Sequence, residues 1–406
     1  MKSPVVSLIE KKGTHSSVIF VQNKKEKLDV QFLKSFNPII SLFFVVGIVI
    51  DIPEAYNLTR IHHYLRIFTK NLCSLFTVFT VSSQLLWLLE LPEKKVEAPF
   101  LFAFILQTSA YLTIYRSRHQ IEMILKRLSH ISKSLEYSTD YRKRKLIARF
   151  YCGLLYGLIV VYVFYYFYSG QRRLVKEHLK NSSFFKNILR IPGNYAMIYR
   201  DVSLCCYSLG NSLAMTSTAA CFTFMCIQMK ALFHHLGTQI RDLKVRDDFY
   251  RLFDAYNELV AVVNLVDDVF SYSALVIVVN CMTGLFRVIY SLVFVREICF
   301  QNDFYFCFMG FYYLIILLSV ISMASETVQF GKHVQELIVS IPGSFPSHYH
   351  ELKLLIKIKN VKRKVALTLW KMYAIDRSLV VSALGTFTTY GLLFATLGNV
   401  QNQEKN

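Results

Sequence analysis

Residues 303–328 read DFYFCFMGFYYLIILLSVISMASETV, an apolar run that is long enough to cross a lipid bilayer as a single helix. A membrane-spanning helix needs about 20 mostly apolar residues, more than a buried strand or a short core helix uses. Similar runs occupy 71–91, 99–115, 150–170, 199–229, 273–298 and 378–400. The chain is 54% hydrophobic and only 18% charged, and its charges cluster between these runs. The sequence therefore predicts an all-α membrane protein with seven transmembrane helices.

The positive charges between the runs predict the orientation of the chain. Cytoplasmic loops of membrane proteins carry an excess of Lys and Arg. With the N-terminus inside, 34 of the 46 Lys and Arg residues fall in cytoplasmic segments and ten fall outside. We therefore expect an inside N-terminus and an outside C-terminus. The apolar run 36–50 is short, and counting it as a span would place the Arg142–Lys145 cluster outside. We interpret it as a helix at the inner membrane surface.

These boundaries divide the chain into four parts. Residues 1–70 are a cytoplasmic N-terminal segment that contains the surface helix, and residues 71–328 are a six-span helix bundle with cytoplasmic extensions. Residues 329–377 are a cytoplasmic anchor segment, and residues 378–406 are the last helix with a short outer tail. Apolar residues recur at helical spacing in 116–150, 230–270 and 348–376. These segments predict helices that continue below the membrane and pack together as an anchor domain. The block 329–350, with Pro342-Gly343, is typical of a loop between two such helices.

Composition and motifs exclude several classes of protein. The net charge of +19 follows from the basic cytoplasmic loops, and no soluble basic domain is left to bind nucleic acid. Phosphate-binding, metalloprotease and nucleophile-elbow motifs do not occur, and the nine cysteines form no C-x-x-C pair. We therefore expect neither an enzyme nor a bound metal or cofactor. Asn181-Ser182-Ser183 lies in the outer loop 171–198 and is a candidate glycosylation site.

Aromatic side chains are concentrated in the outer half of the predicted bundle. Candidates for a ligand pocket between the helices are Phe164, Tyr165, Tyr168, Tyr207, Phe308, Phe311 and Tyr312. The alternative is an aromatic belt at the membrane–water interface together with ordinary packing. Both interpretations use the same residue types, so the sequence leaves both open.

The last apolar helix carries a recognisable pattern. Residues Val365–Gly398 read VALTLWKMYAIDRSLVVSALGTFTTYGLLFATLG, in which Thr389-Tyr390 is followed by five apolar or small residues. This end resembles the signature of insect gustatory receptors, which is Thr-Tyr, five apolar residues and Gln-Phe. The chain has Thr396-Leu397 at the last two positions. The lead-in from Tyr373 and the inverted topology extend the resemblance over nearly the whole chain.

The resemblance implies a taste receptor that acts as a ligand-gated, non-selective cation channel in the plasma membrane of sensory neurons. In this family four subunits, identical or mixed, assemble around a pore lined by the last helix, and a small-molecule tastant binds in the outer bundle. The candidate pore and gate residues are Thr386, Thr389, Tyr390, Leu393, Thr396 and Leu397. No carboxylate lies among them, which predicts poor discrimination among cations. The alternative is that this stripe is a helix–helix packing seam.

The residue after Thr-Tyr bears on the ligand. Sugar-responding members of the family typically carry an acidic residue there, and this chain has Gly391. Together with the aromatic outer bundle, this favours a bitter or other non-sugar tastant. A G-protein-coupled receptor is the first alternative, but its last span should end in the cytoplasm. A transporter is the second, but its broken helices and intramembrane charges are not visible in the sequence.

Overall fold

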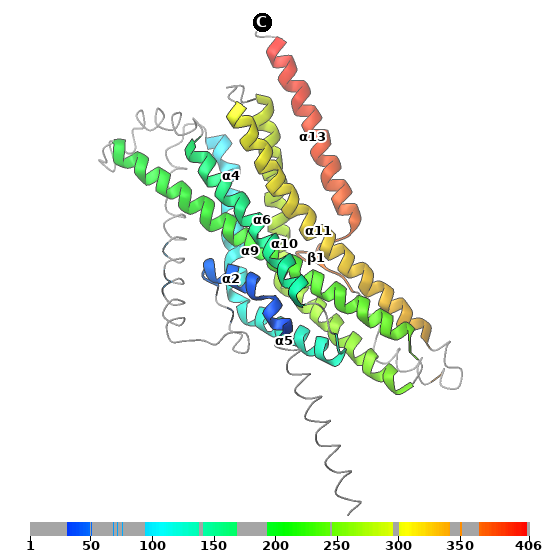
Figure 1. Ribbon diagram of the computed structural model, residues 1–406. Helices are drawn as coiled ribbons and strands as arrows, with labels where there is room; N and C mark the ends of the chain where they lie inside the picture. Colours follow the sequence, from blue (N-terminus) through cyan, green and yellow to red (C-terminus); the bar gives the residue numbers. More distant parts are fainter. Residues whose placement is uncertain are drawn as a thin grey trace, which may run out of the picture.

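The computed structural model describes residues 31–48, 50, 68, 71, 75, 94–137, 141–168, 193–243, 246–294, 300–341, 350 and 365–403. This part of the chain is an elongated helical bundle with a long C-terminal helix along one edge (Figure 1). Its elements are α2 (Asn37–Val45), α4 (Lys94–Arg116), α5 (Arg118–Ser134), α6 (Tyr141–Tyr168), α9 (Gly193–Arg241), α10 (Arg246–Phe294), α11 (Phe300–Ser340), β1 (Thr368–Leu369), β2 (Tyr373–Ala374) and α13 (Arg377–Gln403).

Three helices are far longer than a bilayer is thick. Helices α9 and α10 have 49 residues each and α11 has 41. At about 1.5 Å per residue they extend roughly 60–75 Å, about twice the ~30 Å hydrocarbon core. The segments of them that are long and apolar enough to cross a membrane are Ser212–Arg241, Phe249–Ile289 and Phe306–Ser340. The helices thus run without a break beyond the apolar runs, as the sequence predicts. The number of spans and the orientation of the termini stay predictions.

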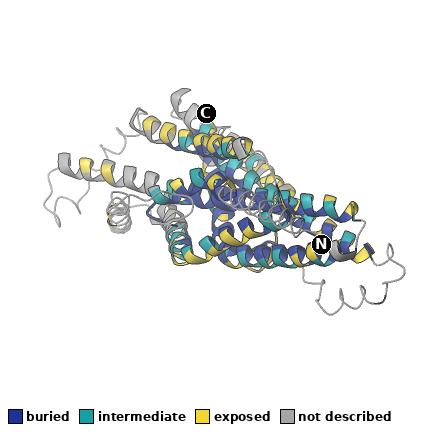
Figure 2. Ribbon diagram, turned by 60° about the horizontal axis from the view of Figure 1, so that its bottom comes forward, coloured by how far each residue is buried: buried dark blue, intermediate teal, exposed yellow. Residues whose placement is uncertain are grey.

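Helix α10 lies at the centre of the bundle and contacts α4, α5, α9, α11 and α13. Its helical repeat of apolar residues is buried, and it includes Leu252, Tyr256, Leu259, Val260 and Val263. This confirms the helical spacing predicted for 230–270. Buried residues gather along the middle of the bundle and exposed residues lie on its outer surfaces (Figure 2).

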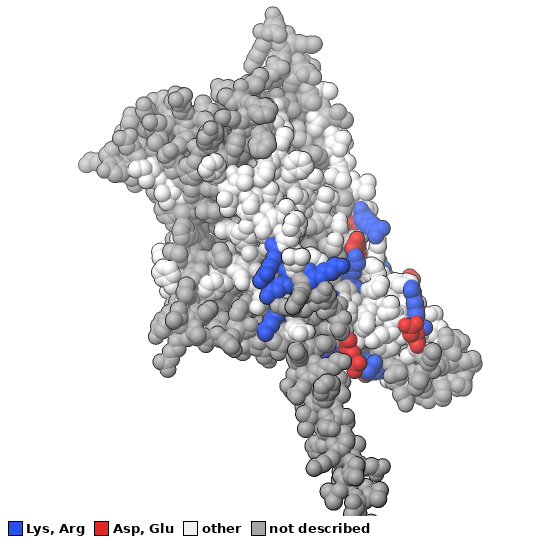
Figure 3. Space-filling view, viewed as in Figure 1, with Lys and Arg blue, Asp and Glu red and all other residues white. Residues whose placement is uncertain are grey.

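On one face of the molecule, charged side chains gather toward one end. On the face shown in Figure 3, Lys and Arg of the described residues lie over the lower half, and the upper described surface is uncharged. The C-terminal end of α13 points away from the charged half (Figure 1). This distribution is the one expected if the uncharged part lies in lipid and the charged part faces the cytoplasm.

The structure differs from the sequence prediction in three segments. The helix predicted at 36–50 is shorter, ending at Val45, and it packs against α6 and α9; its place at a membrane surface stays a prediction. The loop predicted at 329–350 is wrong over its first part, because α11 continues to Ser340. The helix predicted at 348–376 is wrong over 365–376, since β1 and β2 form an antiparallel hairpin that pairs Thr368 with Ala374.

The predicted span at 71–91 and most of the N-terminal segment 1–70 lie outside the described residues. The described residues of these two segments are 31–48, 50, 68, 71 and 75.

Candidate functional site

One face of α13 is open in the isolated chain. Leu393 is 50% exposed, and Thr386, Thr389 and Thr396 are exposed too. Residues three and four apart lie on the same side of a helix, so these side chains form one stripe. The three threonine hydroxyls donate to carbonyl oxygens of the preceding turn, at 2.8–2.9 Å. Each hydroxyl is therefore satisfied within the helix while its oxygen still faces outward to accept a hydrogen bond.

Other side chains of α13 pack on its own chain, mainly on α10 and α11. Leu379 and Ala383 pack against the hydrophobic core. The ring of Tyr390 meets Phe286 edge to face, with 5.4 Å between ring centroids. Of the predicted pore and gate residues, the structure therefore places Thr386, Thr389, Leu393 and Thr396 on the open face. Tyr390 is half exposed and in contact with α10, and the side chain of Leu397 lies outside the described residues.

Gly391 lies against α10. A Cβ built at this glycine would come within 3.2 Å of Cδ1 of Ile289, closer than ordinary van der Waals contact. The absence of a side chain at this position thus lets α13 approach α10 closely. An acidic side chain here would have to displace Ile289 or turn aside from it.

The hairpin at the foot of α13 is bound to α10 through Asp267. The Asp267 carboxylate is 6% exposed and accepts hydrogen bonds from the backbone N–H of Thr368 at 2.6 Å and from its hydroxyl at 2.9 Å. It also accepts one from the ammonium group of Lys371, which in addition reaches Asp268 at 2.7 Å. Burial opposes the charge on Lys371, but its hydrogen bonds to the two carboxylates outweigh this and raise the pKa of Lys371.

The turn of the hairpin has an unusual backbone conformation. Trp370 and Lys371 have φ of 46° and 59°, and the N–H of Met372 donates to the carbonyl of Leu369 at 3.0 Å. Two consecutive residues with positive φ define a type I′ turn, which usually contains Asn and Gly. Neither residue is present here, so the turn is strained and depends on the surrounding contacts.

Asp376 caps the first turn of α13. Its Oδ1 accepts a hydrogen bond from the hydroxyl of Ser378 at 2.6 Å and from the backbone N–H of Leu379 at 3.2 Å. The Ser378 hydroxyl is the main cause of a lowered pKa for Asp376, and the Leu379 N–H is the second. The helix and the hairpin are thus joined by a capping residue rather than by a flexible linker.

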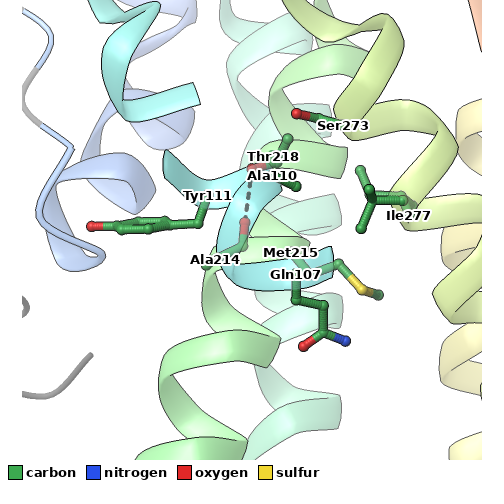
Figure 4. Close-up of a pocket in the computed structure, with 9 residues that line it drawn as sticks. Gln107, Ala110, Tyr111, Ala214, Met215, Thr218, Ser273 and Ile277 are labelled. Carbon is green, nitrogen blue, oxygen red and sulfur yellow. Dashed lines mark hydrogen bonds between the residues drawn. The ribbon is translucent and has the colours of Figure 1, made fainter. Parts of the chain in front are cut away.

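A narrow cavity lies between α4, α9 and α10 (Figure 4). The space inside it that a water-sized molecule can occupy is about 20 Å³, and its lining is Gln107, Ala110, Tyr111, Ala214, Met215, Thr218, Ser273, Val276 and Ile277. The lining carries no charged side chain. The Tyr111 ring points away from the other lining residues, and its hydroxyl donates to the carbonyl of Val46 at 2.8 Å. The Ser273 hydroxyl is buried without a hydrogen-bond partner among the described residues.

The predicted aromatic pocket residues whose side chains the structure describes differ in exposure, and the pocket stays a prediction. Phe164 and Phe311 lie on the outer surface and are 70% and 62% exposed. Tyr312 is buried, and its hydroxyl is 2.8 Å from that of Thr216 on α9; Phe308 is half-buried. The side chains of Tyr165, Tyr168 and Tyr207, and all of Asn181, lie outside the described residues.

The sequence analysis did not single out Asp267, Tyr272 and Trp370, all of which lie at the hairpin. An acidic pair, Asp267-Asp268, within the apolar stretch of α10 was the available signal, because a carboxylate is buried in such a place only with partners. In the residues that the structure describes, no group of three or more His, Cys, Asp or Glu could hold a metal ion.

Comparisons with known proteins agree with this architecture. The chain has the fold of the insect olfactory receptor OR5 from Machilis hrabei, with a TM-score of 0.65 at 13% identity; the match covers 89% of this chain and 97% of the receptor. The structure of that receptor in complex with eugenol gives a TM-score of 0.66 at 13% identity, over 93% of this chain and 99% of the receptor. The fold is therefore that of an insect chemoreceptor.

Residues 66–406 match the family described as trehalose receptor, so the chain belongs to this family of insect gustatory receptors. A search of curated protein sequences finds no match. Membership of the family and the long apolar helices indicate a chemoreceptor that lies in a membrane.

Proposed function

We propose that this protein is a taste receptor of the sensory-neuron plasma membrane that acts as a ligand-gated, non-selective cation channel. Four subunits, all copies of this chain or including related receptors, would surround a pore lined by α13. The observation that carries the proposal is the open face of α13, where three threonine hydroxyls accompany the apolar side chain of Leu393. No charged residue occurs between Arg377 and the end of the helix at Gln403.

The composition of this face favours a pore over a lipid-facing surface. A helix that faced lipid alone would gain nothing from threonines at Thr386, Thr389 and Thr396 on its exposed side. In a ring of four copies, the hydroxyl oxygens would face water and ease the passage of ions, and Leu393 would form an apolar constriction. The absence of a ring of carboxylates supports weak selectivity among cations. The alternative, a packing seam between subunits, places the same face against a neighbour rather than water.

For the ligand, we favour a bitter or other non-sugar molecule. The description of the family names a sugar, trehalose. Against a sugar stand Gly391, which leaves no acidic group beside Tyr390, and the cavity between α4, α9 and α10. The polar groups of its lining are Gln107, the Tyr111 hydroxyl, Thr218 and Ser273; the Tyr111 hydroxyl is bonded to Val46, and the Thr218 hydroxyl is bonded to the carbonyl of Ala214. This lining suits an apolar or amphipathic molecule better than a disaccharide, which has hydroxyls on its whole surface, and the helices must move apart before either can enter.

The orientation forms part of the proposal. With seven spans, the N-terminus and the anchor segment lie in the cytoplasm, and the outer loop with Asn181 becomes glycosylated. Epitope tags at both ends, stained on intact and permeabilised cells, test this. A C-terminus hidden on intact cells would contradict it and would favour a G-protein-coupled receptor.

Currents in oocytes that express the full chain test the function. We expect an inward current with caffeine or another amphipathic bitter compound, of similar size in Na⁺ and K⁺ solutions, and a smaller one with trehalose. Replacing Leu397 by Ala is expected to raise the current without ligand, because the leucine side chain would narrow the predicted gate and alanine would widen it. A current evoked by trehalose and by no bitter compound would contradict the proposed ligand class but would still support a cation channel. No current with any compound of a broad tastant panel, for a chain shown at the cell surface, would contradict a channel formed by this chain alone.

A further inference from the structure

We propose that Tyr272 and the strained turn at Trp370 connect the cavity between α4, α9 and α10 to α13. The two act as positioning residues for the helix that forms the pore. The inference rests on the proposed function in one respect, namely that α13 is the element that opens and closes. Its structural part, that a change at the cavity reaches the foot of α13, stands on the contacts described below.

The connection begins beside the cavity. Ser109 precedes the lining residue Ala110 on α4, and Tyr272 precedes the lining residue Ser273 on α10. Their hydroxyl oxygens are 2.6 Å apart. The Ser109 hydroxyl donates its only proton to the carbonyl of Leu106 at 2.8 Å, so the Tyr272 hydroxyl must be the donor in this pair. Any movement of α4 relative to α10 at the cavity therefore acts on the Tyr272 ring.

The next contact joins Tyr272 to the hairpin. The Tyr272 ring meets the ring of Trp370 edge to face, with 5.8 Å between centroids. The backbone N–H of Trp370 donates to the carbonyl of Ser271 at 2.9 Å. Adjacent residues of α10 thus hold both the backbone and the side chain of Trp370, at the position where the backbone enters its left-handed conformation.

The turn at Trp370 and Lys371 is the moving part because its backbone is strained. Residues other than glycine are unfavourable in the left-handed region and persist there only when neighbouring contacts hold them. Here the contacts are the Tyr272 ring, the Ser271 carbonyl and the Asp267 carboxylate. Loosening one of them lowers the barrier to a relaxed turn, so the hairpin has a second conformation within reach.

The position of the hairpin determines the position of the first turn of α13. The backbone N–H of Ile375 donates to the carbonyl of Leu367 at 2.8 Å, and both side chains are buried. Asp376 follows directly and caps α13 through Leu379. A displacement of the hairpin therefore moves the first turn of α13, with no flexible residue between them to absorb it.

Amide hydrogen exchange of the purified full chain in lipid nanodiscs tests the inference without a ligand. The variant Ser109→Ala removes the acceptor for Tyr272 at the cavity. Exchange is read at the first turns of α13, residues 377–383, which do not include or adjoin Ser109. We expect exchange there to accelerate about fivefold, the factor that corresponds to losing about 1 kcal/mol of a hydrogen bond. Tyr272→Phe should give the same result, since it removes the same bond.

The matched control is Ser319→Ala. Ser319 on α11 accepts from Tyr151 on α6 at 2.6 Å and donates to the carbonyl of Ile316, as Ser109 does with its own partners. It makes no contact with the hairpin, so its loss should leave the exchange of 377–383 unchanged. Equal acceleration by both serine variants would mean general loosening of the bundle and would overturn the inference. No acceleration by Ser109→Ala would overturn it as well. Current recordings test the proposed channel function in a separate experiment. If the parent gives no current with any tastant, the proposed function fails while the exchange result stands.

Discussion

Replacing Asp267 by Asn should release the hairpin from α10. Asn has nearly the same shape as Asp and keeps one oxygen to accept from the Thr368 N–H, but it loses the negative charge that binds Lys371. Its amide N–H₂ would face either the Lys371 ammonium or the Thr368 N–H, and both of these are donors. A hydrogen bond to a charged partner contributes about 1.5–3 kcal/mol, so we expect a loss of about 2 kcal/mol.

The neighbouring carboxylate provides the control. Asp268 also bonds Lys371, but its side chain is 62% exposed while that of Asp267 is 7% exposed. Exposed ion pairs contribute about 0–1 kcal/mol, so Asp268→Asn should have little effect. The measurement is amide exchange of residues 365–376 in the full-length protein. About 2 kcal/mol corresponds to roughly 30-fold faster exchange for Asp267→Asn, against less than about fivefold for Asp268→Asn. Equal effects of the two variants would refute the buried carboxylate as the anchor of the hairpin.

Three further variants probe packing and capping. Gly331→Ala places a Cβ 2.6 Å from Cγ1 of Val365, so thermal unfolding should show a loss of about 1–3 kcal/mol, and adding Val365→Ala should recover part of it; additive losses would contradict this contact. Gly284→Ala meets the Tyr313 ring at 2.4 Å and should lower the yield of folded protein in size-exclusion chromatography; a parent-like yield would show that α10 and α11 separate easily. Asp376→Ala should cost about 1 kcal/mol at pH 7 by loss of the cap. The pKa of Asp376 is lowered in the folded chain, so its contribution to stability is present above the unfolded pKa near 4 and is lost as pH falls through the folded pKa. The unfolding free energies of parent and variant should therefore converge on acidification. A difference that stays constant with pH would contradict the charge dependence of the cap.

The long helices could be predicted from sequence because their signal is local. The apolar runs locate the helices, and the spacing of Leu252, Tyr256, Leu259 and Val263 shows that α10 continues beyond its run and gives its buried face. The local sequence did not predict the hairpin of β1 and β2. Trp370-Lys371 contains neither Gly nor Asn, so nothing in the chain near it signals a type I′ turn. The turn is held by Ser271 and Asp267, about one hundred residues earlier.

Residue type alone is a weak guide to the candidate pocket. Aromatic residues favour both the interior of a bundle and its lipid-facing surface, so residue type alone does not say which way a side chain points. Phe311 and Tyr312 are neighbours in the sequence, yet the first is exposed and the second buried. On α13 the stripe through Thr389 and Leu393 is exposed, as a pore-lining stripe must be in a single subunit. Its role in a pore stays a prediction.

The most direct test of the account is modification of a cysteine at Thr389 during ligand application. Thr389 lies on the open face of α13, while Ala383 packs against the core of its own chain and serves as the control. In oocytes, a positively charged thiol reagent applied with an activating tastant should block the current of Thr389→Cys and leave that of Ala383→Cys unchanged. A current through Thr389→Cys that the reagent never alters, in open or closed channels, would contradict a pore lined by α13.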